Sequence, residues 1–390
     1  MRSSRKRLLA PLVPLLAVGV AVIASGCGSS PNQPASGSST GTTSARTRSQ
    51  VSAAETFLAQ YKNRPTEWGG LTPLQRYEVR YKPPTGKTFA ILQVAGSSQA
   101  EEETQAFAAP LAALGWKEKV IDYDETNPAT LISAMKAALL YHPVAVTFAA
   151  IPYAEWAVEV PAYDKAGVAL IPVAAGPLPA NKEIAGNITG PIYLQLAAHV
   201  IADWFIVASN GSGHGLLYNV PDAPAVAEWG QDFRKYVAAG CSRCSLTVVS
   251  QSIADVMAGG ENADIVSALQ RNPSDKYVFM ADYPLTVGLP SALHAAGISG
   301  IQIGGSYAGA ADQALIKEGQ EAAGTPQALD TADWSAIDAV VRHLEGMPQA
   351  PGDDIQPIQL LTSATVGTPV NSFNYPAGYQ EYFKKLWRVG

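Results

Sequence analysis

Ser133 and Lys136 are the pair of residues whose spacing comes nearest to a nucleophile with an activating base. The Ser-x-x-Lys pattern sets the two side chains one helical turn apart, as in penicillin-recognising enzymes, where the lysine activates the serine. The companion patterns of those enzymes, Ser-Asp-Asn and Lys-Thr-Gly, do not occur in the sequence. The pair is therefore interpreted as part of an amphipathic helix, and no enzymatic activity is predicted.

Cys241 and Cys244 form a Cys-x-x-Cys motif, which could be a redox pair, half of a zinc site or a structural disulfide. A second cysteine pair for zinc is missing, and the motif precedes a predicted strand rather than opening a helix. Outside the cytoplasm a small disulfide is the favoured interpretation. The five histidines show no ligand spacing, so no metal or other cofactor is predicted.

Two further stretches have simple structural interpretations. The glycine-rich residues 211–215 precede a predicted strand, whereas a phosphate cradle follows a strand and opens a helix, so a tight turn is expected. The three acids Glu101, Glu102 and Glu103 are interpreted as the solvated start of a helix.

The N-terminus has the layout of an export signal. Four basic residues within positions 2–7 precede an apolar run, 8–23, that is shorter than the roughly 20 residues of a membrane span. The run ends in Ala-Ser-Gly-Cys27, which resembles the bacterial lipobox and implies removal of 1–26 and a lipid on Cys27. The alternative is an ordinary signal followed by an unmodified cysteine. Residues 27–51 are rich in Ser, Gly, Thr and Pro and are expected to be a flexible tether.

The composition describes the rest of the chain as a well-packed globular protein. Of its 390 residues, 47% are apolar and 15% charged. Without the four basic residues of the signal, 23 basic residues stand against 33 acidic ones, a net charge of −10. So acidic a chain argues against nucleic acid and anionic lipid as its main partners. No later segment approaches 20 apolar residues, and the length favours about two domains.

Apolar periodicity from residue 88 onward alternates between strand and helix. A short helix, 52–64, precedes this region. The first series predicts strands at 88–95, 119–123, 144–150 and 168–173, with helices at 101–114, 128–140 and 153–166. The second predicts helices at 192–208, 226–239, around 264–269 and at 285–296, with strands at 215–219, 246–251, 277–281 and 301–304. The fold class is therefore α/β, two doubly wound parallel-sheet lobes joined by a hinge, with a ligand between them at the carboxyl ends of the strands.

The order of several motifs resembles the type I periplasmic binding proteins, in the sugar-binding branch typified by ribose-binding protein. The similarity runs over about residues 87–346. It is carried by the opening strand and loop, 87–107, by Asn127-Pro128, by 162–173, by 280–305 and by the crossing segment 325–346. The final stretch, 378–387, is similar to the tail of longer members.

The resemblance implies a set of ligand-binding residues. Ser97, Ser98 and Gln99 lie in the loop after the first strand, Asn187 lies at the first crossing between lobes, and Asp282 falls on the family's ligand-binding carboxylate. Tyr153, Asn219, Trp229, Ser306 and Gln327 complete the predicted set. Bidentate groups such as Asp282, Asn219 and Gln327 suit a neutral polyol, which also needs a flat ring to stack on.

Departures from the family pattern bear on the ligand. Trp229 stands where sugar binders usually place an arginine, and Ser306 stands at an aspartate position. The exchange of arginine for tryptophan removes a fixed donor fork and adds an apolar face. The cleft is thus expected to favour a ligand with an apolar face over free ribose. Further aromatic residues follow predicted strands, and about half are expected to reach the ligand: Tyr153, Trp156, Tyr283 and Tyr307.

These features predict the lipid-anchored, extracytoplasmic capture protein of an ABC importer, a monomer that binds a sugar-like small molecule and docks on membrane permease subunits. The alternatives are an amino-acid or aromatic ligand, or a sensing lipoprotein that presents its closed form to a signalling partner. The expected organisation is a signal, 1–26, a tether, 27–51, and an N-terminal extension, 52–86. Lobe 1 is expected at 87–188 plus 327–350, and lobe 2 at 189–326 plus 351–390.

Overall fold

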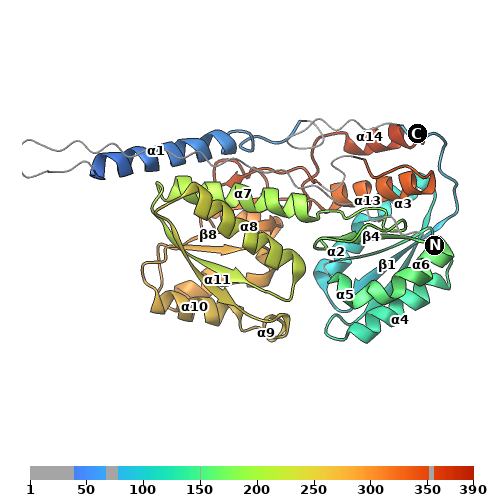
Figure 1. The fold of residues 1–390 in the computed structure, drawn as a ribbon, viewed down its shortest axis with the longest axis horizontal. Coiled ribbons are helices and arrows are strands. Elements are labelled where there is room, and N and C mark those ends of the chain that lie inside the picture. Colours follow the sequence, from blue (N-terminus) through green and yellow to red (C-terminus); the bar gives the residue numbers. More distant parts are fainter. Residues whose placement is uncertain (1–38, 67–77, 150, 351–354) are drawn as a thin grey trace, which may run out of the picture.

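A computed structural model describes residues 39–66, 78–149, 151–350 and 355–390. Two lobes lie side by side, each a mainly parallel sheet with helices on both faces (Figure 1). The predicted fold class is thereby confirmed. The signal segment 1–26, Cys27 and the expected tether up to residue 38 lie outside the described residues.

Lobe 1 contains a sheet of four parallel strands in the order β2-β1-β3-β4. The strands are β1 Thr88–Val94, β2 Lys117–Tyr123, β3 Ala145–Ala149 and β4 Ala169–Val173, and the helical segments are α2 Ser98–Ala106, α3 Ala108–Leu114, α4 Pro128–Leu139, α5 Tyr153–Trp156, η1 Ala157–Glu159 and α6 Val160–Ala166. A strand covered on both faces must be apolar throughout, and Phe89 to Leu92 of β1 are all buried.

Lobe 2 contains six strands in the order β10-β9-β8-β7-β5-β6, of which only the edge strand β10 is antiparallel to its neighbour. The strands are β5 His214–Asn219, β6 Ser245–Ser250, β7 Tyr277–Met280, β8 Gln302–Ala308, β9 Ala323–Pro326 and β10 Leu361–Thr362. The helical segments are α7 Pro191–Ala208, α8 Pro224–Gly240, α9 Ile253–Met257, α10 Glu261–Arg271, η2 Tyr283–Thr286, α11 Leu289–Ala295 and α12 Ala310–Glu318.

Three of the expected helices are divided, two of them at a proline and the third at a glycine. Pro110 has no N–H to donate to the carbonyl of Ala106, so the expected helix 101–114 breaks into α2 and α3. Pro161 has the same effect on Ala157, and the expected helix 153–166 becomes α5, η1 and α6. In the expected helix 285–296, η2 is followed by Gly288 at φ 82°, and α11 begins at Leu289, one residue before Pro290.

The N-terminal helix α1, Ser39–Leu58, is longer than the sequence pattern predicts. It contains residues 39–51, so this part of the expected flexible tether is helical. Its C-terminal half packs on lobe 2, where Ala54 is buried beside Ile206 and Cys241, and the Phe57 ring stacks on His199 with 3.8 Å between ring centroids. Burial of these apolar side chains explains why a stretch rich in small residues becomes an ordered helix.

Helix α7 is the buried central helix of lobe 2. Among the described residues it alone has the length and composition to cross a membrane, but most of it is buried, and it packs against α1 and α8. Its side chains form one apolar cluster with those of the strands beneath it, including Phe205, Leu217 and Phe279. The helix therefore belongs to the core of the lobe.

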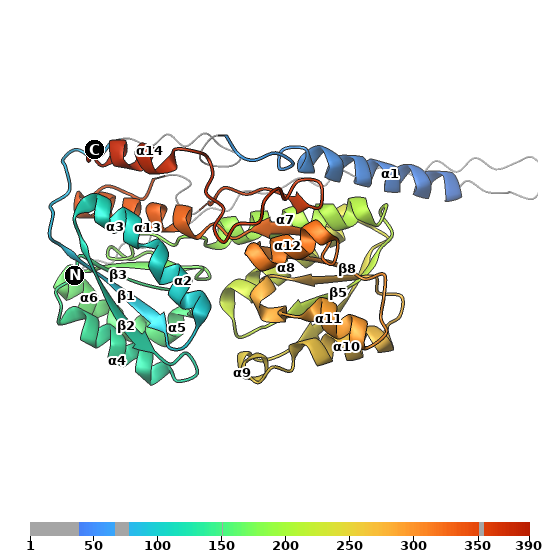
Figure 2. The ribbon, with the colours of Figure 1, turned by 180° about the vertical axis from the view of Figure 1, so that it is seen from behind.

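The chain returns to lobe 1 twice after β9. Helix α13, Leu329–Leu344, packs on lobe 1 as expected, but so does α14, Tyr379–Leu386. The assignment of the whole segment 351–390 to lobe 2 is therefore wrong for the C-terminal helix. The physical reason is the burial of apolar side chains, because Phe383 and Trp387 are fully buried in the lobe 1 core. Figure 2 shows α14 lying over α13.

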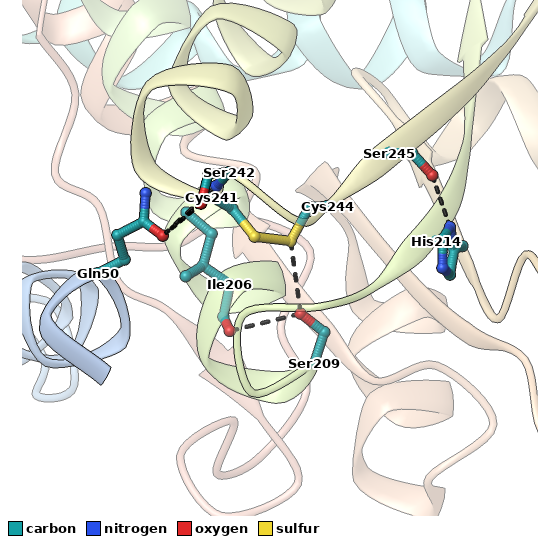
Figure 3. Close-up of a disulfide and its surroundings, with 8 residues drawn as sticks. All are labelled: Gln50, Ile206, Ser209, His214, Cys241, Ser242, Cys244 and Ser245. Carbon is teal, nitrogen blue, oxygen red and sulfur yellow. Dashed lines mark hydrogen bonds between the residues drawn. A yellow bond between two sulfur atoms is a disulfide. The ribbon is translucent and has the colours of Figure 1, made fainter. Parts of the chain in front are cut away.

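Cys241 and Cys244 are bonded to each other in the turn between α8 and β6 (Figure 3). The turn also contacts the N-terminal helix, because the N–H and the hydroxyl of Ser242 both donate to Oε1 of Gln50, at 3.4 Å and 3.2 Å. The disulfide loop thus belongs to the surface on which α1 is seated.

We expect this disulfide to form in an oxidising compartment and to contribute little stability. The two cysteines are three residues apart, and closing so short a loop restricts the unfolded chain much less than a long loop does. The free energy of unfolding of a Cys241→Ser/Cys244→Ser variant should therefore fall by less than the about 2–4 kcal/mol that loss of a disulfide typically costs. Thiol counting after denaturation without reductant, in a Cys27→Ser background, should find no free thiol. Two free thiols would contradict the expectation.

Candidate functional site

A chamber lies between the two lobes, where the carboxyl ends of their strands face each other. Two adjoining pockets form it, and they share Glu103, Ala149, Val173 and Tyr307. The outer pocket is bordered by α2, by the ends of β3 and β4, by the start of α7, by α8 and by β8. The inner pocket extends into lobe 1 as far as α13. In a doubly wound fold this edge of the sheet is where ligands bind.

Four of the predicted ligand residues line this chamber: Gln99, Trp229, Asp282 and Ser306. Trp229 and Ser306 are in direct contact, since the indole N–H donates to the serine hydroxyl at 3.0 Å. The Trp229 ring is fully buried and stacks on Phe233, with the two centroids 5.1 Å apart. The indole therefore forms part of the wall, and its N–H is already satisfied.

The other six predicted residues are not among the described residues that line the chamber. Ser97 caps α2 by accepting from the N–H of Ala100, and Ser98 is exposed at the start of that helix. Tyr153 packs edge-on against Trp156, and Asn219 lies against Gly230 of α8. Gln327 is buried where the chain leaves β9, and its backbone carbonyl accepts from Phe373.

Asn187 holds the first crossing segment between the lobes. Its side-chain amide donates to the carbonyls of Ala175 and Gly176, at 2.9 Å and 3.1 Å, and its oxygen accepts from the Ala175 N–H. These bonds tie the crossing to the end of β4. In this structure Asn187 therefore shapes the crossing, and Thr189, two residues on, lines the chamber.

Tyr307 lines both pockets, whereas three other candidate aromatics do not. Tyr153 is turned onto Trp156, Trp156 is fully buried against Phe148, and the hydroxyl of Tyr283 donates to the carbonyl of Ala323. Ser306 and Tyr307 both face the chamber although consecutive side chains of a regular strand point to opposite faces. A β-bulge explains this, because the β8–β9 register shifts between Gly305 and Ala308 and Tyr307 has φ 64°.

Three carboxyl groups face the chamber without a nearby cation. Burial raises the pKa of Asp282 to about 8, and the charges of Glu103 and Asp312 add to the rise. Burial likewise raises the pKa of Glu103 to about 7, opposed by the hydrogen bond from Gln99. The pKa of Asp333 on α13 is raised well above its usual value, first by burial and then by Glu103. None of the described residues that line the two pockets is Lys, Arg or His.

Two of these acids, Glu103 and Asp333, are not among the predicted ligand residues, although each carries a recognisable signal in the sequence. Glu103 was interpreted as solvated, but it stands three residues after Ala100 and four before Phe107, which also line the chamber. An acid at helical spacing within such a face points inward. Asp333 lies between Ala332 and Trp334 in a helix that is buried on almost every side. Tyr193, at the start of α7, was also missed.

Both polar side chains of the Ser-x-x-Lys motif, Ser133 and Lys136, make ordinary contacts on the surface of their helix. The Ser133 hydroxyl donates to the carbonyl of Ala129 in its own helix, and the Lys136 ammonium lies 3.5 Å from Glu159. Within the described residues, no group of three or more His, Cys, Asp or Glu side chains is arranged to hold a metal ion.

A separate hollow lies beside the C-terminal segment. It is lined by residues of α2, α13 and 370–377, among them Glu102, Asp330 and Tyr375, and it shares Leu329 with the inner pocket. It does not lie at the carboxyl ends of the strands. The chamber is therefore the better candidate for a ligand site.

Comparison with known proteins shows similarity of fold. No protein-family model matches the sequence, and no curated protein matches it. Among solved structures, the 5-methylthioribose transporter solute-binding protein of Thermotoga lettingae is 12% identical, with a TM-score of 0.65 over 80% of this chain and 99% of that one. A galactofuranose-binding protein is 14% identical, with a TM-score of 0.63 over 77% and 99% of the two chains.

An ABC sugar transporter subunit from Rhodobacter sphaeroides is 19% identical, with a TM-score of 0.61 over 72% of this chain and 99% of that one. These neighbours are matched along almost their whole length, so the similarity covers both lobes and the crossings between them. The chain accordingly has the fold of the type I periplasmic binding proteins.

Proposed function

We propose that the protein is the extracytoplasmic solute-binding component of an ABC importer and captures a sugar-like ligand between its lobes. The observation that carries the proposal is the chamber itself, which is bordered by α2 and α13 of lobe 1 and by α8, β8 and the two residues after β7 in lobe 2. A ligand that contacts both walls stabilises the closed state, and permease subunits can recognise that state without any chemistry on the ligand.

The names of the structural neighbours support a sugar-like ligand. Those proteins are described as sugar transporter subunits or sugar-binding proteins, and one is in complex with 5-methylthioribose, a substituted sugar. The aromatic wall of the chamber, with Tyr193, Trp229 and Tyr307, suits a ring that has one apolar face.

A thermal-shift screen tests the proposal directly. Sugars, polyols, nucleosides, amino acids and aromatic acids would be compared, since a ligand at 100 times its Kd adds about 2.7 kcal/mol to the stability of the bound protein. A raised transition with sugars or polyols supports the proposal. Stabilisation by amino acids or aromatic acids alone would establish the alternative ligand class.

A sensing lipoprotein that uses the same chamber is the second candidate. It would bind its ligand equally well but would present the closed form to a signalling partner. Crosslinking of the liganded protein in membranes separates the two roles, since an importer component should be recovered with permease subunits.

Asp282→Ala should weaken ligand binding by about 1–3 kcal/mol, roughly 5- to 150-fold in Kd, because a buried partner on the ligand loses its hydrogen bond. Trp229→Phe, which keeps the stack on Phe233 but removes the indole N–H, should weaken binding by a smaller factor. Calorimetry with the ligand found in the screen measures both effects. Asp122→Ala, at an exposed position on β2, is the matched control. Equal affinity of the Asp282 variant and the control would contradict the assignment.

Lipidation of Cys27 is expected from the export signal and the small residues before it. The protein extracted from membranes should then lack residues 1–26 and carry a diacylglyceryl group on Cys27. Intact mass spectrometry checks both statements, and Cys27→Ala should leave the protein unlipidated. Cleavage at another position, or an unmodified Cys27, would show that the segment is an ordinary signal.

A further inference from the structure

Three parts of the chain each place one carboxyl group at the chamber: Glu103 lies on α2, Asp282 is the second residue after the end of β7, and Asp333 lies on α13. Asp333 is only 5% exposed, and its Oδ2 has no hydrogen-bond partner; Oδ1 of Asp282 is likewise buried without a partner. Glu103 lies in both pockets and links the other two acids.

None of the described residues that line the two pockets supplies a compensating positive charge. The polar groups that face these acids are Gln99 on α2, Tyr123 at the end of β2, Thr189 and Tyr193 at the start of α7, and Ser306 and Tyr307 on β8. Glu102 on α2, Asp312 on α12 and Asp330 on α13 are further acids close enough to influence them. Every ionisable group known to act on the three acids is therefore itself acidic or phenolic.

A cluster of buried carboxyl groups without a cation is unfavourable unless a ligand compensates it. An ionised group in a low-dielectric site is destabilised when it is unpaired, so a buried acid stays protonated until a cation pairs with it. A neutral sugar offers hydroxyl donors but no positive charge with which an ionised acid could pair. An ammonium group offers three N–H donors together with a positive charge, and it matches acceptors that have no partner in the protein.

We propose that the ligand of this chamber is a cation, a sugar-like or cyclitol-like ring carrying a protonated amine that pairs with Glu103 and Asp282, the two acids that line the same pocket. The inference rests on the proposed solute-binding function and specifies its ligand class. The apolar face of the ring packs on Tyr193, Trp229 and Tyr307, and aromatic faces next to carboxylates also favour a cation.

The pH dependence of the affinity distinguishes this mode of binding from the binding of a neutral ligand. Acids that are partly protonated near neutral pH must ionise to pair with an ammonium group, so binding of an amine releases protons and strengthens as the pH rises. A neutral ring has no such requirement. Affinity as a function of pH therefore separates the two kinds of ligand even when both fit the chamber.

The experiment compares aminated rings with their neutral parents by calorimetry at pH 5.5 and pH 8. The probes are 6-amino-6-deoxy-D-glucose, 6-amino-6-deoxy-D-galactose and 2-deoxystreptamine, against D-glucose, D-galactose and myo-inositol. At least one amine should bind 10-fold or more tightly than its parent at pH 8, with a smaller ratio at pH 5.5. Glu103→Gln and Asp282→Asn should each reduce the ratio at least 5-fold, whereas Glu101→Gln, an equal charge change at an exposed position of the same helix, should leave it unchanged.

The binding results distinguish failure of the cationic-ligand proposal from failure of the proposed solute-binding function. Neutral sugars that bind as tightly as the amines at both pH values would overturn the cationic ligand and leave the solute-binding function standing. Binding of spermidine or putrescine but of no ring would retain the cation and overturn the sugar-like class. Absence of binding by every probe and by every solute of the wider screen would overturn both the inference and the proposed function.

Discussion

Replacing Trp387 with alanine is expected to lower the free energy of unfolding of lobe 1 by about 3–5 kcal/mol. Trp387 follows α14 and is fully buried, with its ring stacked on Trp334 at a centroid distance of 5.1 Å. The substitution removes this stack and leaves a cavity in the core. It also removes the indole N–H that donates to Oδ1 of the buried Asp338 at 2.7 Å.

Chemical denaturation followed by tryptophan fluorescence and by circular dichroism would measure the loss. The two lobes could unfold separately, so coincidence of the two probes must be tested before a single free energy is assigned. Lys385→Ala, at an exposed position of the same helix, is the control and should change stability by no more than about 0.5 kcal/mol. A loss below 1 kcal/mol for Trp387→Ala would mean that α14 is not an integral part of lobe 1.

Without ligand, the protein is expected to lose stability as the pH rises from about 4 to about 8. The pKa of Asp282 is raised to about 8 and that of Glu103 to about 7 in the folded chain, whereas both lie near 4 in an unfolded chain. The folded state therefore holds more protons throughout this range. Its stability is fully present below the unfolded pKa and is lost as the pH rises through the folded pKa.

Asp282→Asn should remove part of this slope and stabilise the unliganded protein at pH 8 by an amount on the order of 5 kcal/mol. Thermal unfolding of the wild type and the variant at several pH values gives the measurement, and Glu101→Gln serves as the control for a lost surface charge. The two proteins should be nearly equal at pH 4. A variant that follows the wild-type curve throughout would show that Asp282 is not held protonated.

The elements that could be predicted are those with strong local signals. Helix α4 has a proline in its first turn and Asn127 as its cap, whose side chain accepts from the N–H of Ala129, and its predicted end is within one residue of the observed one. Strand β1 is apolar throughout and covers nearly the predicted residues. The short strands of lobe 2, such as β9 and the edge strand β10, carry too few residues for a periodic pattern.

The chamber could be predicted only in part, because its residues come together through tertiary contacts. Asp282 and Gln99 follow or flank predicted strands, so their position at the carboxyl edge can be inferred from topology. Asp333 reaches the chamber only because α13 crosses back to lobe 1. Asn187 and Gln327 were placed by resemblance, yet each makes local contacts at a crossing segment instead.

Because α1 packs on lobe 2, the position of this helix bears on which of the two lobes moves when the protein closes. The helix has 20 residues and is about 30 Å long, and Figures 1 and 2 show that it begins at the outer end of lobe 2, away from lobe 1. Gln50, Ala54 and Phe57 fix it to the disulfide turn, α7 and α8. If Cys27 is lipidated as proposed, the membrane holds lobe 2 through a lever arm of this length. Lobe 2 is then held in place at the membrane, and closure on a ligand is a movement of lobe 1 toward lobe 2.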